Sequence, residues 1–202
     1  MAARTSPSTA RNRDPILAVL REYLPPTGLV LEIAAGAGEH AVHMARHLPG
    51  LTWRPTDPDE TALASIAAWR AEADLPNLLE AQRLDASRPG TWPVKAADAI
   101  VCINMVHISP WAATEGLLAG ASAILPDGGV LYLYGPYLED ETPTAPSNLA
   151  FDDSLKSRNP AWGLRRREDV EALAADHGLI LQARIAMPSN NLSLVFRKMN
   201  GG

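Results

Sequence analysis

Short apolar runs of strand length alternate along the chain with longer segments in which apolar residues recur three and four positions apart. The strand-length runs lie at 29–33, 51–56, 78–84, 98–103 and 130–134. The helical segments lie at 11–24, 39–48, 59–73, 112–125 and 167–177. The runs are apolar without strict alternation, which is typical of parallel strands covered on both faces. We therefore predict an α/β fold with helices on both faces of the sheet.

The end of the chain departs from this alternation. Two strand patterns, 179–187 and 192–198, are separated by only four residues, so we expect an antiparallel hairpin. A dinucleotide-binding Rossmann domain would normally continue with parallel strands instead. We expect one domain over residues 11–202, and residues 1–10, which are rich in Ala, Ser and Thr, to form a flexible tail.

A glycine turn follows the first predicted strand. Gly36 and Gly38 precede the helical segment 39–48, so the backbone can approach a ligand closely and present N–H groups at a helix N-terminus. With Ala41, the spacing also fits the dinucleotide fingerprint G-x-G-x-x-G/A. Glu32 argues against a pyrophosphate at this position, because its carboxylate suits a ligand with cationic or hydroxyl groups.

Acidic residues stand at or near the ends of three successive predicted strands. These residues are Glu32, Asp57 and Asp85, and this edge is where open α/β sheets bind ligands. Asp57 lies about 20 residues beyond the glycines, the position from which an acid accepts hydrogen bonds from ribose hydroxyls. It fits a helix N-cap equally well, because Pro58 follows it, and Asp59 could cap instead. Asp85 could also be an ordinary polar residue closing a strand.

Polar and aromatic side chains follow the fourth and fifth predicted strands. Asn104 and His107 follow one strand, and Tyr134 and Tyr137 follow the next, so we expect both pairs at the same ligand edge. A histidine can take a proton near neutral pH, although a lone histidine after a strand is more often a structural residue. Residues 135–164 contain no clear helix, and we interpret them as a lid or a pocket insertion, with a surface loop as the alternative.

Composition excludes several classes of function. A net charge of −5 argues against a nucleic-acid surface, and the single cysteine, Cys102, excludes an intramolecular disulfide and a cysteine zinc site. His40, His43 and His47 share one helical face but lack the H-E-x-x-H spacing, so we expect no metal. No apolar run reaches transmembrane length and no secretory signal is visible, so we expect a cytoplasmic protein with no membrane partner.

Several segments resemble known proteins. E-I-A-A-G-A-G at 32–38 resembles motif I of the class I S-adenosylmethionine (SAM)-dependent methyltransferases, with Ala34 in place of the first glycine. L-P-D-G-G-x-L-x-L at 125–133 resembles the segment before their fifth strand. The segments 11–17, 31–40, 103–111, 135–137 and 158–163 are similar to an uncharacterised methyltransferase-like family once classed as a domain of unknown function. This similarity spans about residues 11–198.

The resemblance implies a Rossmann-like, seven-stranded class I methyltransferase sheet in the order 3-2-1-4-5-7-6, with strand 7 antiparallel. It also implies SAM as the cofactor, with an acid such as Asp85 meeting the adenine amino group. The residues expected to bind the cofactor are Arg11, Asn12, Glu32, Ala34, Gly36, Gly38, Asp57, Asp85, Ala86 and Asn104. The candidates for the acceptor side are His107, Tyr134 and Tyr137.

Three functions remain open. The first is a SAM-dependent methyltransferase acting on a small molecule. The second is a SAM-binding protein that serves as a non-catalytic partner, and the third is an NAD-dependent oxidoreductase. The sequence indicates neither the methyl acceptor nor the oligomeric state.

Overall fold

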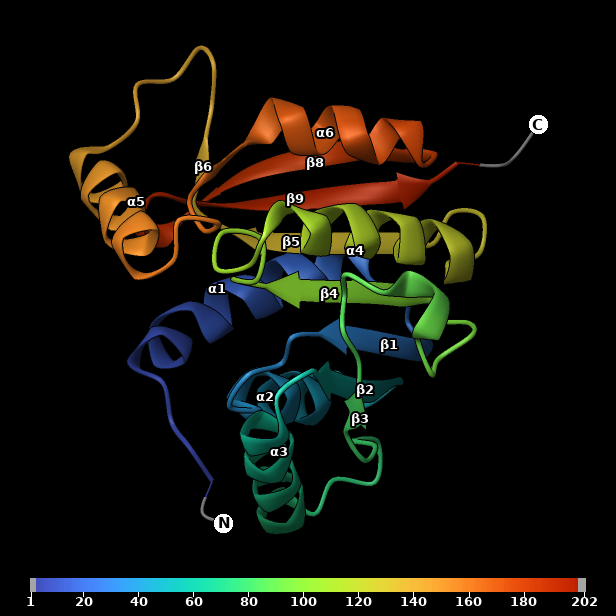
Figure 1. Cartoon of the computed structure of the whole chain (residues 1–202). Helices are drawn as coiled ribbons and strands as arrows, with labels where there is room; N and C mark the ends of the chain where they lie inside the picture. The colour runs from blue at the N-terminus through green and yellow to red at the C-terminus, as the bar shows by residue number, and fades with distance from the viewer. Residues whose placement is uncertain (1–2, 200–202) are drawn as a thin grey trace.

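Parallel strands with apolar residues on both faces build the centre of the molecule (Figure 1), seen in a computed structural model that describes residues 3–199. Seven strands form one sheet in the order β3-β2-β1-β4-β5-β9-β8. β9 runs antiparallel to both β5 and β8, whereas the other neighbours are parallel. The predicted order and its antiparallel hairpin are confirmed. The strands are β1 (Gly28–Ile33), β2 (Leu51–Asp57), β3 (Gln82–Arg83), β4 (Ala99–Ile103), β5 (Val130–Gly135), β8 (Leu179–Met187) and β9 (Asn191–Lys198).

Helices cover both faces of this sheet. On one face α1 (Pro7–Tyr23), α2 (Glu39–His47) and α3 (Glu60–Ala73) contribute to one core cluster. On the other face α4 (Trp111–Ile124) and α6 (Arg167–Asp176) contribute to a second cluster. The remaining elements are α5 (Pro146–Arg158), the paired short strands β6 (Tyr137–Leu138) and β7 (Arg165–Arg166), and the 3₁₀ turns η1 (Pro89–Thr91) and η2 (Pro188–Asn190).

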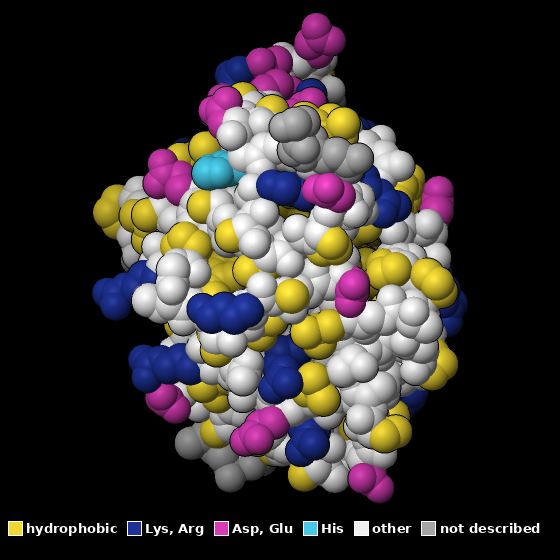
Figure 2. All heavy atoms as spheres, turned by 90° about the vertical axis from the view of Figure 1, so that its right-hand side faces the viewer, with side chains coloured by type: hydrophobic (Ala, Val, Ile, Leu, Met, Phe, Trp, Pro, Cys, Tyr) yellow, Lys and Arg dark blue, Asp and Glu magenta, His cyan; other side chains and the backbone are white. Residues whose placement is uncertain are grey.

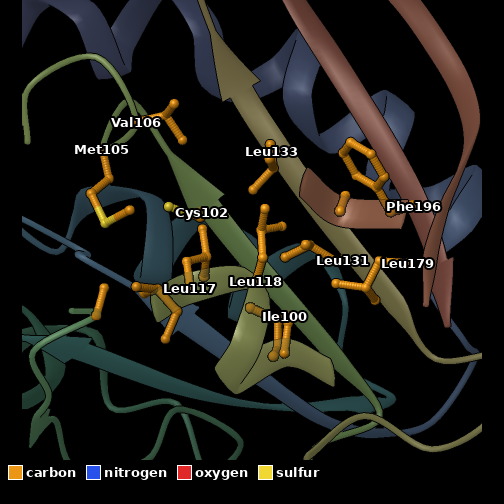
Figure 3. Packing of buried hydrophobic residues seen from close by; sticks show 14 of the residues in the cluster. Ile100, Cys102, Met105, Val106, Leu117, Leu118, Leu131, Leu133, Leu179 and Phe196 are labelled. Carbon is orange, nitrogen blue, oxygen red and sulfur yellow. The ribbon is translucent and has the colours of Figure 1, made fainter. Parts of the chain in front are cut away.

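The central strands divide their side chains between the two clusters. Ile100 and Cys102 of β4 and Leu131 and Leu133 of β5 point toward the α4 face, where they meet Leu117, Leu118, Leu179 and Phe196 (Figure 3). The alternate residues of the same strands belong to the cluster on the α1 face. Because both faces are buried, every residue of β4 and β5 is buried, which explains their continuous apolar runs.

The carboxyl ends of β1, β4 and β5 lie at one edge of the sheet, on the left in Figure 1, beside α5 and the start of α1. The opposite face of the molecule carries interspersed basic, acidic and hydrophobic side chains (Figure 2). Within the described residues, none of the helices is long and apolar enough to cross a membrane.

The first helix begins earlier than expected, which corrects the interpretation of residues 1–10 as a flexible tail. α1 starts at Pro7, a residue suited to a first helical position, and Pro15 lies inside the helix. Upstream of it, the backbone of Arg4 bonds to α3: its N–H donates to Ser65 Oγ and its carbonyl accepts from Trp69 Nε1. Residues 1 and 2 of the expected tail lie outside the described residues.

The expected third strand, 78–84, is mostly irregular. Only Gln82 and Arg83 pair with β2 in a ladder, and Leu78 makes an isolated bridge to Trp53. Between them, the Glu80 carbonyl accepts a hydrogen bond from the side chain of Arg54 in β2.

The segment 135–164 contains a helix that the sequence did not reveal. α5 buries Asn148, Asp152 and Leu155, which have helical spacing, but two of these three residues are polar. Asp152 is held by Lys156 Nζ at 2.5 Å and by the Leu164 N–H at 2.8 Å. A helix anchored by polar groups lacks the apolar stripe on which sequence prediction depends.

Candidate functional site

The glycine turn links β1 to α2 in a left-handed backbone conformation. Gly36 has φ +58° and Gly38 has φ +95°, values that favour glycine. A Cβ added to Gly36 would meet no atom within 4 Å, whereas one added to Gly38 would lie 3.0 Å from the Ile66 backbone. Gly36 therefore borders open space suited to a ligand, and Gly38 allows α2 to begin tightly packed against α3.

Two further residues with positive φ end the neighbouring strands β1 and β4. Ala34 has φ 56° and Asn104 has φ 63°. The left-handed region costs an alanine about 1–2 kcal/mol, which gives a physical reason for a glycine at the position of Ala34 in motif I. Asparagine tolerates this conformation better. Strained backbone of this kind gathers at binding sites, and here it flanks the ligand edge of the sheet.

Asp57 fixes the glycine turn from the end of β2. Its carboxylate accepts hydrogen bonds from the Gly36 N–H at 2.9 Å and the Asp59 N–H at 3.0 Å, and burial raises its pKa. Asp59, rather than Asp57, caps α3, because it accepts from the N–H groups of Thr61 and Ala62. The N-cap interpretation of Asp57 is therefore wrong. Each Asp57 oxygen keeps a lone pair for a further donor.

A cavity of about 500 Å³ opens over the glycine turn, and we call it the glycine-turn cavity. It brings together five of the residues expected to bind the cofactor: Ala34, Gly36, Asp57, Asp85 and Ala86. Its apolar walls were not expected from the sequence. They come from the ends of the third and fourth predicted strands, the segment after β4 and the start of α4, and they include Leu84, Ile103, Met105, Ile108 and Ala113.

Glu32 and Gly38 do not line this cavity, which corrects their expected role as direct ligands. Glu32 is 1% exposed and accepts a hydrogen bond from Trp53 Nε1 at 2.6 Å. Burial raises the pKa of Glu32 to about 8, although the Trp53 bond opposes the change. The side chain is therefore mostly protonated at neutral pH and ties β1 to β2 behind the turn.

A second cavity, of about 570 Å³, lies beside the first and shares Ile108 with it. Arg11, Asn12 and Asn104, which were expected to bind the cofactor, line this second cavity and not the glycine-turn cavity. His107 and Tyr134, two of the three acceptor-side candidates, lie there as expected. The start of α1, the end of β4, the end of β5 and α5 all contribute to its walls.

His107 occupies a tight position in the second cavity. The side chain is 4% exposed and makes an edge-to-face contact with Phe151, with ring centroids 5.7 Å apart. Gly135 makes room for it, since a Cβ there would lie 3.0 Å from His107 Nδ1. Burial, with a contribution from the charge of Arg165, lowers the pKa of His107 to about 4. The imidazole is therefore neutral at neutral pH, with a ring nitrogen able to accept a hydrogen bond, and it is a weaker base than a free imidazole.

Tyr137 lies apart from the other candidates and does not line the second cavity, which corrects its expected place on the acceptor side. It is 6% exposed and packs in the core cluster on the α4 face, whereas Tyr134 belongs to the cluster on the α1 face. Side chains three positions apart in extended chain point to opposite sides, which the sequence interpretation overlooked. The Tyr137 hydroxyl is buried and finds no hydrogen-bond partner among residues 3–199, and burial raises its pKa.

Replacing Tyr137 with phenylalanine is expected to raise the free energy of unfolding by about 1 kcal/mol, because the substitution removes a buried, unpaired hydroxyl. Urea denaturation followed by tryptophan fluorescence measures this change. Tyr132→Phe is the matched control, since the Tyr132 hydroxyl bonds Ser193 Oγ at 2.6 Å and its loss is expected to destabilise. A destabilised Tyr137→Phe protein would show that the hydroxyl has a partner.

The fold is similar to that of solved methyltransferases. An O-methyltransferase family protein from Burkholderia thailandensis shares 18% identity with a TM-score of 0.81, over 96% of this chain and 58% of that one. A protein from Galdieria sulphuraria, described as a putative sarcosine dimethylglycine methyltransferase, shares 13% identity with a TM-score of 0.77, over 95% and 86%. CalO1, a methyltransferase in calicheamicin biosynthesis solved with S-adenosylhomocysteine (SAH), shares 19% identity with a TM-score of 0.71, over 94% and 55%.

These similarities establish the class I methyltransferase-like fold. The chain spans less than two thirds of the length of the Burkholderia protein and of CalO1, at 58% and 55%. The family assignment comes from the sequence, where one family model matches nearly the whole described chain. That match covers residues 3–198, and the chain therefore belongs to the family described as protein of unknown function (DUF938).

Proposed function

We propose that this protein is a SAM-dependent methyltransferase that acts on a small-molecule acceptor. The observation that carries the proposal is the glycine-turn cavity, where Gly36 borders open space and Asp57 is fixed at the end of the next strand. The methyltransferase-like fold and the adjoining second cavity, which would hold the acceptor, support the proposal.

The residues of the glycine-turn cavity fit the cofactor in size and chemistry. A cavity of about 500 Å³ suits a nucleoside with a short side chain. Asp57 would accept hydrogen bonds from the ribose hydroxyls. Asp85 and the Ala86 backbone would meet the adenine, between apolar walls that include Leu84 and Met105.

When bound, SAM supplies an activated methyl group, so the protein mainly needs to align the acceptor and exclude water. Asn104 and Tyr134 would orient the acceptor in the second cavity. His107, neutral at pH 7, would hold a ring nitrogen toward an acceptor that must lose a proton. α5, within the segment 135–164, would act as the lid over this cavity.

Two alternative functions make predictions that differ from those of a methyltransferase. A non-catalytic SAM-binding partner would bind SAH with no turnover. An NAD-dependent oxidoreductase would need a cavity for a pyrophosphate, and the closing β8–β9 hairpin is not typical of that class.

Adding SAH is expected to raise the melting temperature, because a ligand that binds only the folded state stabilises it by mass action, by about 2.7 kcal/mol at a hundredfold excess over its dissociation constant. Thermal unfolding and calorimetric titration measure the effect, with NADH as the matched comparison. Stabilisation by NADH with none by SAH would reverse the assignment. Turnover against a panel of small metabolites then separates an enzyme from a non-catalytic binder.

A further inference from the structure

The charged side chains that line the second cavity are all basic. Of the fifteen residues that line it, Arg11 of α1 and Arg158 at the end of α5 are the charged ones, and none is Asp or Glu. Neither arginine forms an ion pair with any residue in the described part of the chain. Arg158 is instead steadied by the Ser154 carbonyl at 3.3 Å and by the Trp162 ring, 5.7 Å away. Two arginines that form no ion pair among the described residues therefore line one cavity.

Three acidic side chains near these elements are already engaged, and Asp153 of α5 is exposed and does not line the cavity. Asp152 of α5 is bound by Lys156, and Asp14 of α1 lies 3.0 Å from His43 Nε2. Glu39 accepts a hydrogen bond from the Ser6 backbone N–H at the start of α1. These contacts direct the carboxylates toward other partners, and the positive charge of the cavity stays available to a ligand.

Two helix N-termini add to the same potential. Ser8 in the first turn of α1 and Ser147 in the first turn of α5 both line the second cavity. Neither first turn contains an acidic residue or a side-chain cap, although Glu39 partly offsets the end of α1. The positive end of each helix dipole therefore points at this region, where it favours an anion.

The remaining polar groups of the cavity are neutral. His107 is 4% exposed, and its imidazole has no hydrogen-bond partner among the residues that the structure describes. Asn12 and Asn104 contribute amide groups, and Phe151 and Tyr134 contribute aromatic surface. The protein as a whole carries a net charge of −5, so the charge of this cavity is opposite in sign to that of the whole protein.

We propose that the molecule bound in the second cavity carries an anionic group, a carboxylate or a phosphate, held between Arg11 and Arg158, with its apolar part against Phe151 and Tyr134. This inference rests on the proposed function in one respect, that the occupant of the cavity is the methyl acceptor. Guanidinium groups suit both anions, because each offers paired oxygen atoms to the planar donor fork.

The test uses three probes of similar shape: 4-hydroxybenzoate, phenyl phosphate and the neutral 4-hydroxybenzamide. Ligand-detected NMR gives their affinities for the SAH-saturated full-length protein at low and at high salt. The variants are Arg11→Gln, Arg158→Gln and the double substitution. Arg13→Gln is the matched control, since Arg13 is an exposed arginine of α1 that does not line the cavity.

The anionic probes are expected to bind more tightly than the amide, and their affinity is expected to fall as salt rises. Each single substitution should weaken the binding of the anionic probes about fivefold. The double substitution should make the protein bind the anions no more tightly than the amide, and Arg13→Gln should leave all the affinities unchanged. The anionic probe that binds more tightly identifies the anionic group of the natural ligand as a carboxylate or a phosphate.

Equal binding of the amide and the anions would overturn the inference, as would anion binding that survives the double substitution. No binding of either anion to a protein that binds SAH would also overturn it while leaving the proposed function intact. Calorimetric titration of SAH into the wild type and into each variant separates the two proposals. A wild-type protein that does not bind SAH would reject the methyltransferase proposal. Unchanged SAH affinity in the arginine variants would show that these variants remain folded.

Discussion

Replacing Glu32 with glutamine is expected to stabilise the protein increasingly as the pH rises from about 4.5 to about 8. The unfolded chain releases the Glu32 proton near its ordinary pKa of 4.5, whereas burial in the folded protein holds the proton to about pH 8. Raising the pH through this window therefore favours unfolding of the wild type, by about 1.4 kcal/mol for each pH unit between the two pKa values. Glutamine cannot ionise, and its carbonyl can still accept from Trp53 Nε1.

Urea denaturation at several pH values between 4 and 9 measures this difference, expected to reach a few kcal/mol at pH 8 and then level off. The matched control is Glu115→Gln, at an exposed position of α4 where the carboxylate stays in water in both states. A difference between Glu32→Gln and wild type that does not change with pH would show that the Glu32 carboxyl is ionised in the fold.

Replacing Asp57 with alanine is expected to weaken SAH binding tenfold to a hundredfold. The substitution removes a charged acceptor for the ribose hydroxyls, worth roughly 1.5–3 kcal/mol. It also leaves the N–H groups of Gly36 and Asp59 without their acceptor, so the free energy of unfolding should fall as well. Calorimetric titration of SAH and urea denaturation of the same samples give the two quantities.

Asp59→Ala provides the matched control for this experiment. It removes the cap of α3, which typically costs about 1 kcal/mol of stability, but it does not touch the glycine-turn cavity. Both variants are therefore expected to be less stable, and only Asp57→Ala should bind SAH more weakly. Equal SAH affinity in the two variants would assign Asp57 a purely structural role.

Spacing along the chain was enough to place much of the glycine-turn cavity. Gly36, Asp57 and Asp85 each follow a buried strand, and parallel strands bring their carboxyl ends to one edge of the sheet. The direction of a side chain at that edge needed the tertiary structure. Glu32 lies one position earlier in its strand than a cavity residue would, and it turns to the Trp53 indole of β2, a contact between residues 21 positions apart.

Local patterns in the sequence were sufficient to predict the alternation of strands and helices, the closing hairpin and the glycine turn, because apolar periodicity and glycine positions act locally. The strand order was implied by the resemblance to class I methyltransferases, and the structure confirms it. The composition of the second cavity depended instead on tertiary packing. Its walls come from α1, β4, β5 and α5, and α5 is anchored by polar contacts that no apolar pattern records. A cavity built where distant segments meet depends on how they pack, and that packing also placed Arg11 and Arg158 around one hollow and left Tyr137 outside it.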